Sequence, residues 1–212
     1  MNARKALPPV IWRGPRSTSS FSLTFDDGPH LEITPRILDI LASHNARATF
    51  FLVGENAERQ PDIVARMREE GHHVGSHGYA HRADWWRVPG VLSEDIQRGD
   101  TVLGEWISHP RLFRPPHGYL GPSWYLAARR NGYHCVLWNL AGKDWKSIDA
   151  KAVANRVNGR LRPGRIVLLH DCRARTGEAF HHVPDALEAI LRHANERGLK
   201  AVTVPELIGG GS

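Results

Sequence analysis

The sequence predicts an α/β fold in which helices wrap a parallel sheet, either as a barrel or as a doubly wound layer. Short apolar runs rich in β-branched and aromatic residues alternate with segments of helical periodicity along the whole chain. Polar residues follow directly after several of these runs. No internal repeat or break in composition divides the 212 residues, so a single domain is expected.

Six apolar runs are expected to form strands because they are short and bounded by turn-forming residues. In chain order they are FSLTF from Phe21, ATFFLV from Ala48, HVGS from His73, CVLW from Cys135, IVLL from Ile166 and AVTV from Ala201. Residues 1–19 are expected to be an N-terminal extension that can hold a first edge strand. The terminal GGGS, residues 209–212, is expected to be a flexible tail.

The segments between these runs have the spacing of amphipathic helices, with proline near the start or glycine just past the end of several. The expected helices span residues 35–45, 61–70, 122–131, 149–161 and 184–197. Ser93 is expected to cap a further helix that buries Ile96, Leu103 and Trp106.

Composition excludes several classes of protein. The net charge of +6 favours anionic partners, but the 28 Lys and Arg are dispersed among 22 Asp and Glu with no nucleic-acid-binding motif, so no nucleic-acid partner is expected. No apolar run approaches the roughly 20 residues of a transmembrane helix. The N-terminus MNARKALPPV lacks the apolar segment of a signal peptide. We therefore expect a cytoplasmic protein, or a secreted or cell-envelope protein whose leader has been removed, and in either case a monomer.

The two cysteines, Cys135 and Cys172, are too few for a disulfide scaffold. Cys135 opens one expected strand and Cys172 follows the end of another, so parallel strands would hold them at opposite ends. We expect both to be unpaired.

Polar residues at the carboxyl ends of parallel strands collect on one rim of such a sheet. Four groups meet this condition: Asp26 with Asp27, His77, residues 139–145, and His170 with Asp171. The sequence therefore predicts one polar site at that rim.

A metal ion explains two features of this rim. His77 and His81 are four residues apart, which allows both imidazoles to face one ion, and two His with one Asp leave a position open for water. Asp26 and Asp27 are adjacent in TFDDGP and disfavour each other's charge. If one of them ligates a cation, the other can remain an ionised base beside it.

The sequence resembles the polysaccharide deacetylases of carbohydrate esterase family four. Five motifs carry this resemblance in order: TFDDGP (24–29), HGYAH (77–81), RPPHG (114–118), KDW (143–145) and LLHD (168–171). The resemblance covers residues 20–208, which would be the catalytic domain. It implies a distorted, partly open (β/α) barrel with about seven parallel strands. It also implies a zinc-dependent hydrolase that removes N-acetyl groups from N-acetylglucosamine residues of a chitooligosaccharide or peptidoglycan type of glycan, releasing acetate.

The resemblance further implies a role for each motif residue. Zn2+, or alternatively Co2+, Ni2+ or Mn2+, would bind Asp27, His77 and His81. Asp26 would be the general base and His170 the general acid, with Asp144 hydrogen-bonded to His170. Arg114 would pair with Asp26, with Arg47 as an alternative partner. The backbone N–H of His117 would stabilise the oxyanion. The expected substrate contacts are Trp145, Leu168, Tyr119 and Pro116.

Some features leave the substrate open. NLAGKDW, residues 139–145, lacks the upstream Asp that many relatives carry. Trp85 and Trp86 could form an aromatic wall or pack in the ordinary way. Four residues after the His170 strand could reach the groove but are expected to be solvated loop residues: Arg173, Arg175, His181 and His182. The alternatives are an O-acetyl xylan esterase, a lipid-linked sugar deformylase or deacetylase and, in a different class, a non-catalytic glycan-binding module.

Overall fold

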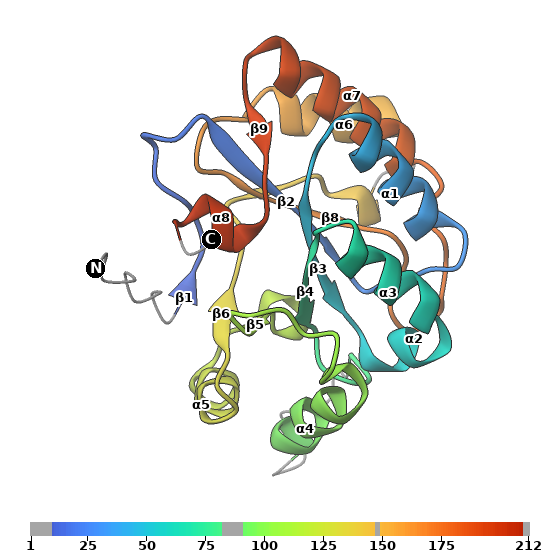
Figure 1. The fold of residues 1–212 in the computed structure, drawn as a ribbon, viewed down its shortest axis with the longest axis vertical. Coiled ribbons are helices and arrows are strands. Elements are labelled where there is room, and N and C mark those ends of the chain that lie inside the picture. The colour runs from blue at the N-terminus through green and yellow to red at the C-terminus, as the bar shows by residue number, and fades with distance from the viewer. Residues whose placement is uncertain (1–9, 82–90, 147–148, 210–212) are drawn as a thin grey trace.

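The computed structural model describes residues 10–81, 91–146 and 149–209. Within these residues, nine strands form one curled parallel sheet with helices on its outside (Figure 1). The strand order is β1-β6-β5-β4-β3-β2-β8-β7, and β9 pairs with the start of β2. The α/β prediction and the partly open barrel are confirmed, with two more strands than the seven expected.

The strands are β1 (Val10–Ile11), β2 (Ser20–Asp26), β3 (Ala48–Leu52), β4 (His73–Ser76), β5 (Leu112–Phe113), β6 (His134–Val136), β7 (Leu140–Ala141), β8 (Ile166–His170) and β9 (Lys200–Ala201). The α-helices are α1 (Ile33–Ser43), α2 (Gly54–Arg59), α3 (Pro61–Glu69), α4 (Val91–Leu103), α5 (Pro122–Arg130), α6 (Ala150–Asn158), α7 (Val183–Glu196) and α8 (Val204–Leu207). Two short 3-10 turns, η1 (Pro116–Gly118) and η2 (Asp144–Lys146), follow β5 and β7.

Both faces of the sheet are buried, which explains why every residue of ATFFL is buried and all but Thr49 are apolar. Successive side chains of a strand point to opposite faces, so Phe50 joins the large cluster under the helices and Phe51 a smaller cluster inside the curl. Val204 and Leu207 of α8 complete that inner cluster.

The same alternation decides which residues of β2 reach the site. Phe25 packs under the helices, so Thr24 and Asp26 face the inside of the curl. β2 lies between β3 and β8, and Asp26 pairs in register with His170. The carboxyl ends of the two central strands therefore bring a carboxylate and an imidazole to the same level of the rim.

Several expectations about elements differ from the structure. The strand expected at AVTV ends at Ala201, because Thr203 caps α8 through a capping box with Glu206 and Pro205 lies in the first turn. Ser93 is not a cap, since α4 already begins at Val91, and Trp106 lies beyond the end of that helix. Strands β5 and β7 and helices α2 and α8 are too short to give a periodic pattern, and the sequence did not predict them.

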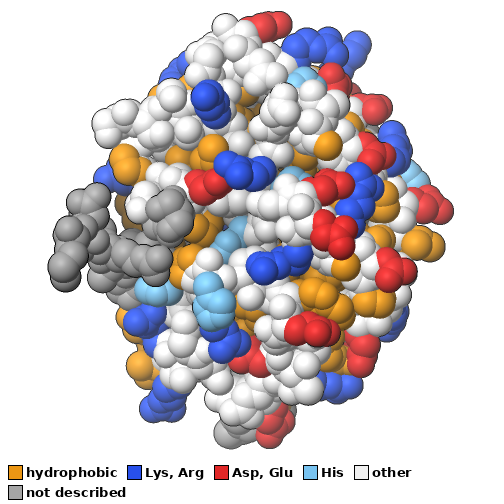
Figure 2. Space-filling model, viewed as in Figure 1, with side chains coloured by type: hydrophobic (Ala, Val, Ile, Leu, Met, Phe, Trp, Pro, Cys, Tyr) orange, Lys and Arg blue, Asp and Glu red, His pale blue; other side chains and the backbone are white. Residues whose placement is uncertain are grey.

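The remaining expectations concern the termini and the surface. β1 lies at one edge of the sheet, while residues 1–9 of the expected extension, residues 210–212 of the tail, and Trp85 and Trp86 lie outside the described residues. Cys135 and Cys172 are both free and buried, as expected. On the face shown in Figure 2, Lys and Arg side chains are spread out with Asp and Glu among them. In the described part of the chain, no helix is both long enough and apolar enough to cross a membrane.

Candidate active site

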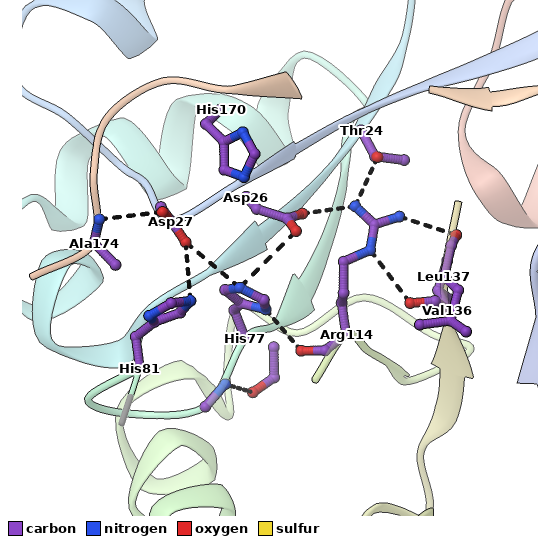
Figure 3. Close-up of polar contacts among 12 residues, drawn as sticks. Thr24, Asp26, Asp27, His77, His81, Arg114, Val136, Leu137, His170 and Ala174 are labelled. Carbon is purple, nitrogen blue, oxygen red and sulfur yellow. Dashed lines mark hydrogen bonds and ion pairs between the residues drawn. The ribbon is translucent and has the colours of Figure 1, made fainter. Parts of the chain in front are cut away.

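The turn after β2 separates the two neighbouring carboxylates. Asp26 is the last residue of the strand, whereas Asp27 has a left-handed backbone with φ of 79°, which is uncommon for a residue other than glycine. The side-chain amide of Asn56 donates to the Asp27 carbonyl at 2.7 Å and helps to hold this conformation. As a result, the shortest contacts of Asp26 and Asp27 are to different residues, although His77 Nε2 lies 3.9 Å from Asp26 Oδ2 and 3.5 Å from Asp27 Oδ1 (Figure 3).

Asp26 faces the fully buried guanidinium of Arg114. Arg114 NH1 lies 2.6 Å from Asp26 Oδ1 and 2.7 Å from Thr24 Oγ1. The other nitrogens donate to the carbonyls of Val136 and Leu137, and the group lies 4.2 Å over the ring of Phe51. Burial lowers the pKa of Arg114, and the carboxylate of Asp26 opposes that shift.

The alternative partner, Arg47, lies elsewhere. Its guanidinium forms an ion pair with Glu206 at 2.6 Å and is half exposed. Arg114 is therefore the arginine that meets Asp26.

Asp27 faces His77 and His81. Its Oδ1 atom lies 3.5 Å from His77 Nε2 and 3.4 Å from His81 Nε2, and the three ligand atoms lie within 4.8 Å of one another. The other oxygen, Oδ2, accepts a hydrogen bond from the Ala174 backbone at 3.1 Å. Although burial favours its neutral form, His77 and the other nearby histidines hold the pKa of Asp27 well below its usual range.

The donor atoms of this triad fit a metal cation. His77 Nδ1 lies 2.7 Å from the Arg114 carbonyl, which can only accept, so Nδ1 carries a hydrogen and Nε2 faces Asp27. Although burial favours the neutral ring, the charges of Asp26 and Asp27 raise the pKa of His77, so a cation is favoured at Nε2. Asp27 Oδ1 is buried and has no hydrogen-bond partner among the described residues. Burial and the neighbouring His77 also lower the pKa of His81 to about 3, which favours a neutral ligand. A buried carboxylate oxygen and two imidazole nitrogens that converge in this way suit a shared cation.

His170 lies on the other side of the two carboxylates (Figure 3). Its Nδ1 is 3.1 Å from Asp144 Oδ1, and its backbone N–H donates to Asp144 Oδ2 at 2.6 Å. Burial alone would lower the pKa of His170, but the charge of Asp144, with that of Asp27, outweighs burial and raises it to about 9. The imidazole is therefore held as a cation near neutral pH.

These groups open into a pocket of about 600 Å³. Of the four expected substrate contacts, Trp145 and Leu168 line it, whereas Pro116 and Tyr119 do not, and Tyr119 is 54% exposed. The backbone turns sharply at His117, where φ is 59°, so His117 and Gly118 reach the pocket while Tyr119 lies at the surface.

Several residues that line the pocket were not predicted from the sequence or were predicted to lie elsewhere. Trp138 and Phe180 form apolar walls, and no motif or periodicity predicted either of them there. Arg173 and Arg175, expected to be solvated loop residues, line the pocket from an exposed loop together with Thr176. His181 and His182 do not line it, and His182 Nε2 instead lies 3.2 Å from the Asp144 carbonyl.

Comparison with known proteins relates the whole chain to glycan deacetylases. A family model described as polysaccharide deacetylase matches residues 13–136. A peptidoglycan-N-acetylglucosamine deacetylase of Bacillus cereus is 35% identical over 213 residues, covering 98% of each chain. A chitooligosaccharide deacetylase of Rhizobium leguminosarum bv. phaseoli is 39% identical over 158 residues, covering 72% of this chain and 68% of the relative.

Solved structures share the fold. The Bc1960 peptidoglycan N-acetylglucosamine deacetylase has a TM-score of 0.86 and 34% identity, covering 96% of this chain and 94% of that one. BA3943 of Bacillus anthracis, described as a pseudoenzyme, has a TM-score of 0.82 and 26% identity, covering 95% of this chain and 69% of that one. Because the same fold also occurs in a pseudoenzyme, activity must be argued from the side chains of the site.

The buried pair of Arg114 and Asp26 predicts strong coupling. Arg114→Met or Asp26→Asn alone leaves one buried group without its partner and should lower the free energy of unfolding of the metal-free protein by about 3–5 kcal/mol. The double variant should lose clearly less than the sum of the two, measured by urea unfolding. The control is Arg66→Met, because Arg66 pairs at the surface with Asp39 and with Glu70, each at 2.6 Å, and this substitution should cost under about 1 kcal/mol. Additive losses would contradict the coupling.

Proposed function

Because the chain belongs to the polysaccharide deacetylase family, we propose that it is a metal-dependent hydrolase that removes N-acetyl groups from N-acetylglucosamine residues of a glycan and releases acetate. The observation that carries this proposal is the different environment of two adjacent carboxylates in one pocket. Asp26 has an arginine partner, Asp27 faces two imidazoles, and His170 lies opposite them.

The metal of this proposal is zinc, held by Asp27, His77 and His81. One carboxylate and two imidazoles suit Zn2+, and the same ligand set could also take Co2+, Ni2+ or Mn2+. When bound, such a cation supplies Lewis-acid polarisation of the acetyl carbonyl and lowers the pKa of water.

Asp26 is proposed to be the base and His170 the acid. Arg114 fixes the orientation of Asp26, so the carboxylate can take a proton from the water that attacks the carbonyl carbon. The C–N bond then breaks, and His170, protonated through its contact with Asp144, gives its proton to the leaving amine. The products are acetate and a free amino group. The backbone N–H of His117 is the proposed oxyanion donor, since neither Pro115 nor Pro116 has an N–H.

Two walls of the pocket suit an acetylated sugar. Leu168 is two residues before His170 on β8, faces the same side of the sheet and offers an apolar contact for the acetyl methyl group. Trp145 and Trp138 offer flat faces for a sugar ring. Since the relatives include peptidoglycan deacetylases, the proposal favours the cell envelope over the cytoplasm as the place of action.

A substrate screen tests the proposed reaction. The metal-reconstituted protein should release acetate from N-acetylated chitooligosaccharides or peptidoglycan faster than from acetylxylan, measured with an enzymatic acetate assay. Faster release from acetylxylan would instead support an O-acetyl esterase, and activity only on a polyprenyl-phosphate sugar in membranes would support a lipid-linked substrate. No release from any acetylated glycan would support a glycan-binding module.

The division of roles between the carboxylates predicts two different kinds of loss. Asp26→Asn should keep the metal and reduce turnover by about 100-fold or more, because it removes the base. Asp27→Ala or His77→Ala should lose the metal as well, because each removes a ligand. Metal content after dialysis against a weak chelator, read beside the acetate assay, separates the two. Full activity in Asp26→Asn would refute the role given to it.

His170 predicts an alkaline limit of activity. The acid must be protonated, and its raised pKa of about 9 keeps it so at neutral pH, so kcat/KM should fall as the pH rises through the pKa. Asp144→Asn removes the main charge that raises this pKa and should move the limit to lower pH. Asp149→Asn is the control, since Asp149 is an exposed cap of α6. An unchanged limit in Asp144→Asn would exclude His170 as its source.

A further inference from the structure

One wall of the pocket is formed by the loop between β8 and α7. Arg173, Ala174, Arg175 and Thr176 all line the pocket. The loop is not loose at its base: Cys172 and Ala179 form an antiparallel bridge, and the Arg173 backbone donates to the Glu178 carbonyl at 2.9 Å. The Ala174 backbone N–H donates to Asp27 at 3.1 Å (Figure 3), so the loop is anchored on a residue of the triad.

The two arginines of this loop are not equivalent. Arg173 forms an ion pair with Glu178 at 2.9 Å and lies 5.6 Å over the ring of Phe180, so its charge is compensated. Arg175 is exposed near the tip of the loop and forms no ion pair or hydrogen bond with any residue that the structure describes. Burial and the charge of His77 lower the pKa of His117, and the charge of Arg175 lowers it further. Arg175 therefore lies close enough to His117 for their charges to interact.

The carboxylates of the pocket cannot neutralise Arg175 in its place. Asp26 is held by Arg114, and Asp27 is held by Ala174 and the two histidines. Among the described residues, the guanidinium of Arg175 therefore has no charge partner at the rim of the pocket.

A neighbouring pocket carries charge of the same sign. A recess of about 310 Å³ shares Trp138 with the catalytic pocket and includes Lys143, Arg160 and Arg165 among its lining residues. Its described lining contains no Asp or Glu. The surroundings of the pocket thus favour an anionic substrate on more than one side.

A neutral N-acetylglucosamine oligomer offers a guanidinium only hydroxyl and amide oxygens, whereas a carboxylate offers a charged bidentate partner. We propose that Arg175 makes the protein prefer glycans that bear carboxylates beside the acetylated sugar, as peptidoglycan does, to neutral chitooligosaccharides. This proposal rests on the proposed function. The carboxylate can come from the lactyl ether of the adjacent sugar or from a peptide attached to it.

The test compares Arg175→Gln with the parent protein on three substrates: a chitooligosaccharide, peptide-free peptidoglycan strands with free lactyl carboxylates, and strands that retain their peptides. We expect kcat/KM to fall about fivefold on at least one carboxylate-bearing substrate, mainly through KM, and to stay unchanged on the chitooligosaccharide. The substrate that shows the fall identifies the carboxylate. An equal fall on the neutral substrate, or no fall on any, overturns the proposal.

Two further measurements keep this proposal separate from the proposed reaction. Arg173→Gln is the matched control on the same loop and should have a smaller effect because its charge is compensated; an equal or larger effect overturns the assignment to Arg175. The second measurement is the affinity of the same three glycans for the Asp26→Asn variant and for the Asp26→Asn/Arg175→Gln double variant. Calorimetry gives this affinity without turnover. Weaker binding of carboxylate-bearing glycans alone supports the proposal even if acetate release fails, and unchanged binding overturns it.

Discussion

The buried guanidinium of Arg114 is the constraint on which the site depends. Its hydrogen bonds join residues that are far apart in sequence: Thr24 and Asp26 at the end of β2, and the carbonyls of Val136 and Leu137 after β6. Its own carbonyl accepts from His77 Nδ1 and so fixes the ring that faces Asp27. One residue therefore orients both the carboxylate proposed as the base and one imidazole of the proposed metal site, which couples the two halves of the site.

Three carboxylates crowd the ends of β2 and β8, and each is accommodated differently. Asp26 has a cation, and Asp27 has imidazoles and an unpartnered oxygen suited to a metal. Asp171 is fully buried, hydrogen-bonded to Thr34, and has a pKa raised to about 7, mainly by burial and further by Asp27. Its carboxylate fills the space beside Gly28, where a Cβ would lie 2.0 Å from Asp171 Oδ2. The glycine of TFDDGP thus leaves room for a third acid, whose partial neutrality limits the repulsion around Asp27.

The sequence predicted the parts of this arrangement that depend on where strands end. TFDDGP, HGYAH and LLHD follow strands in one sheet, so their side chains had to meet at its rim, and the structure brings them together. The sequence could not decide which arginine pairs with Asp26, because the answer depends on how far each side chain reaches. Arg114 and Arg47 were both candidates, and Arg114 is the partner because Asp26 lies on the inward face of β2. Trp138 was not predicted to line the pocket, and Arg175 was expected to be solvated, because their positions follow from loop paths, for which no periodicity exists. The two-residue strands β5 and β7 are defined by their neighbours rather than by their own sequence.

Because the fold is shared with a pseudoenzyme, the sheet alone determines neither turnover nor specificity. The residues proposed for chemistry lie at strand ends or in the turns directly after them, where register fixes them, whereas Arg175 lies on a loop whose tip is free to differ. The anchor between Ala174 and Asp27 joins these two parts. The backbone of the loop must keep its path to satisfy a buried carboxylate oxygen, while the side chain next to that anchor can change without disturbing the triad. Such an arrangement allows the charge of the rim to change while the geometry of the proposed catalytic residues stays the same, so the choice of glycan and the hydrolysis of its amide can be altered separately.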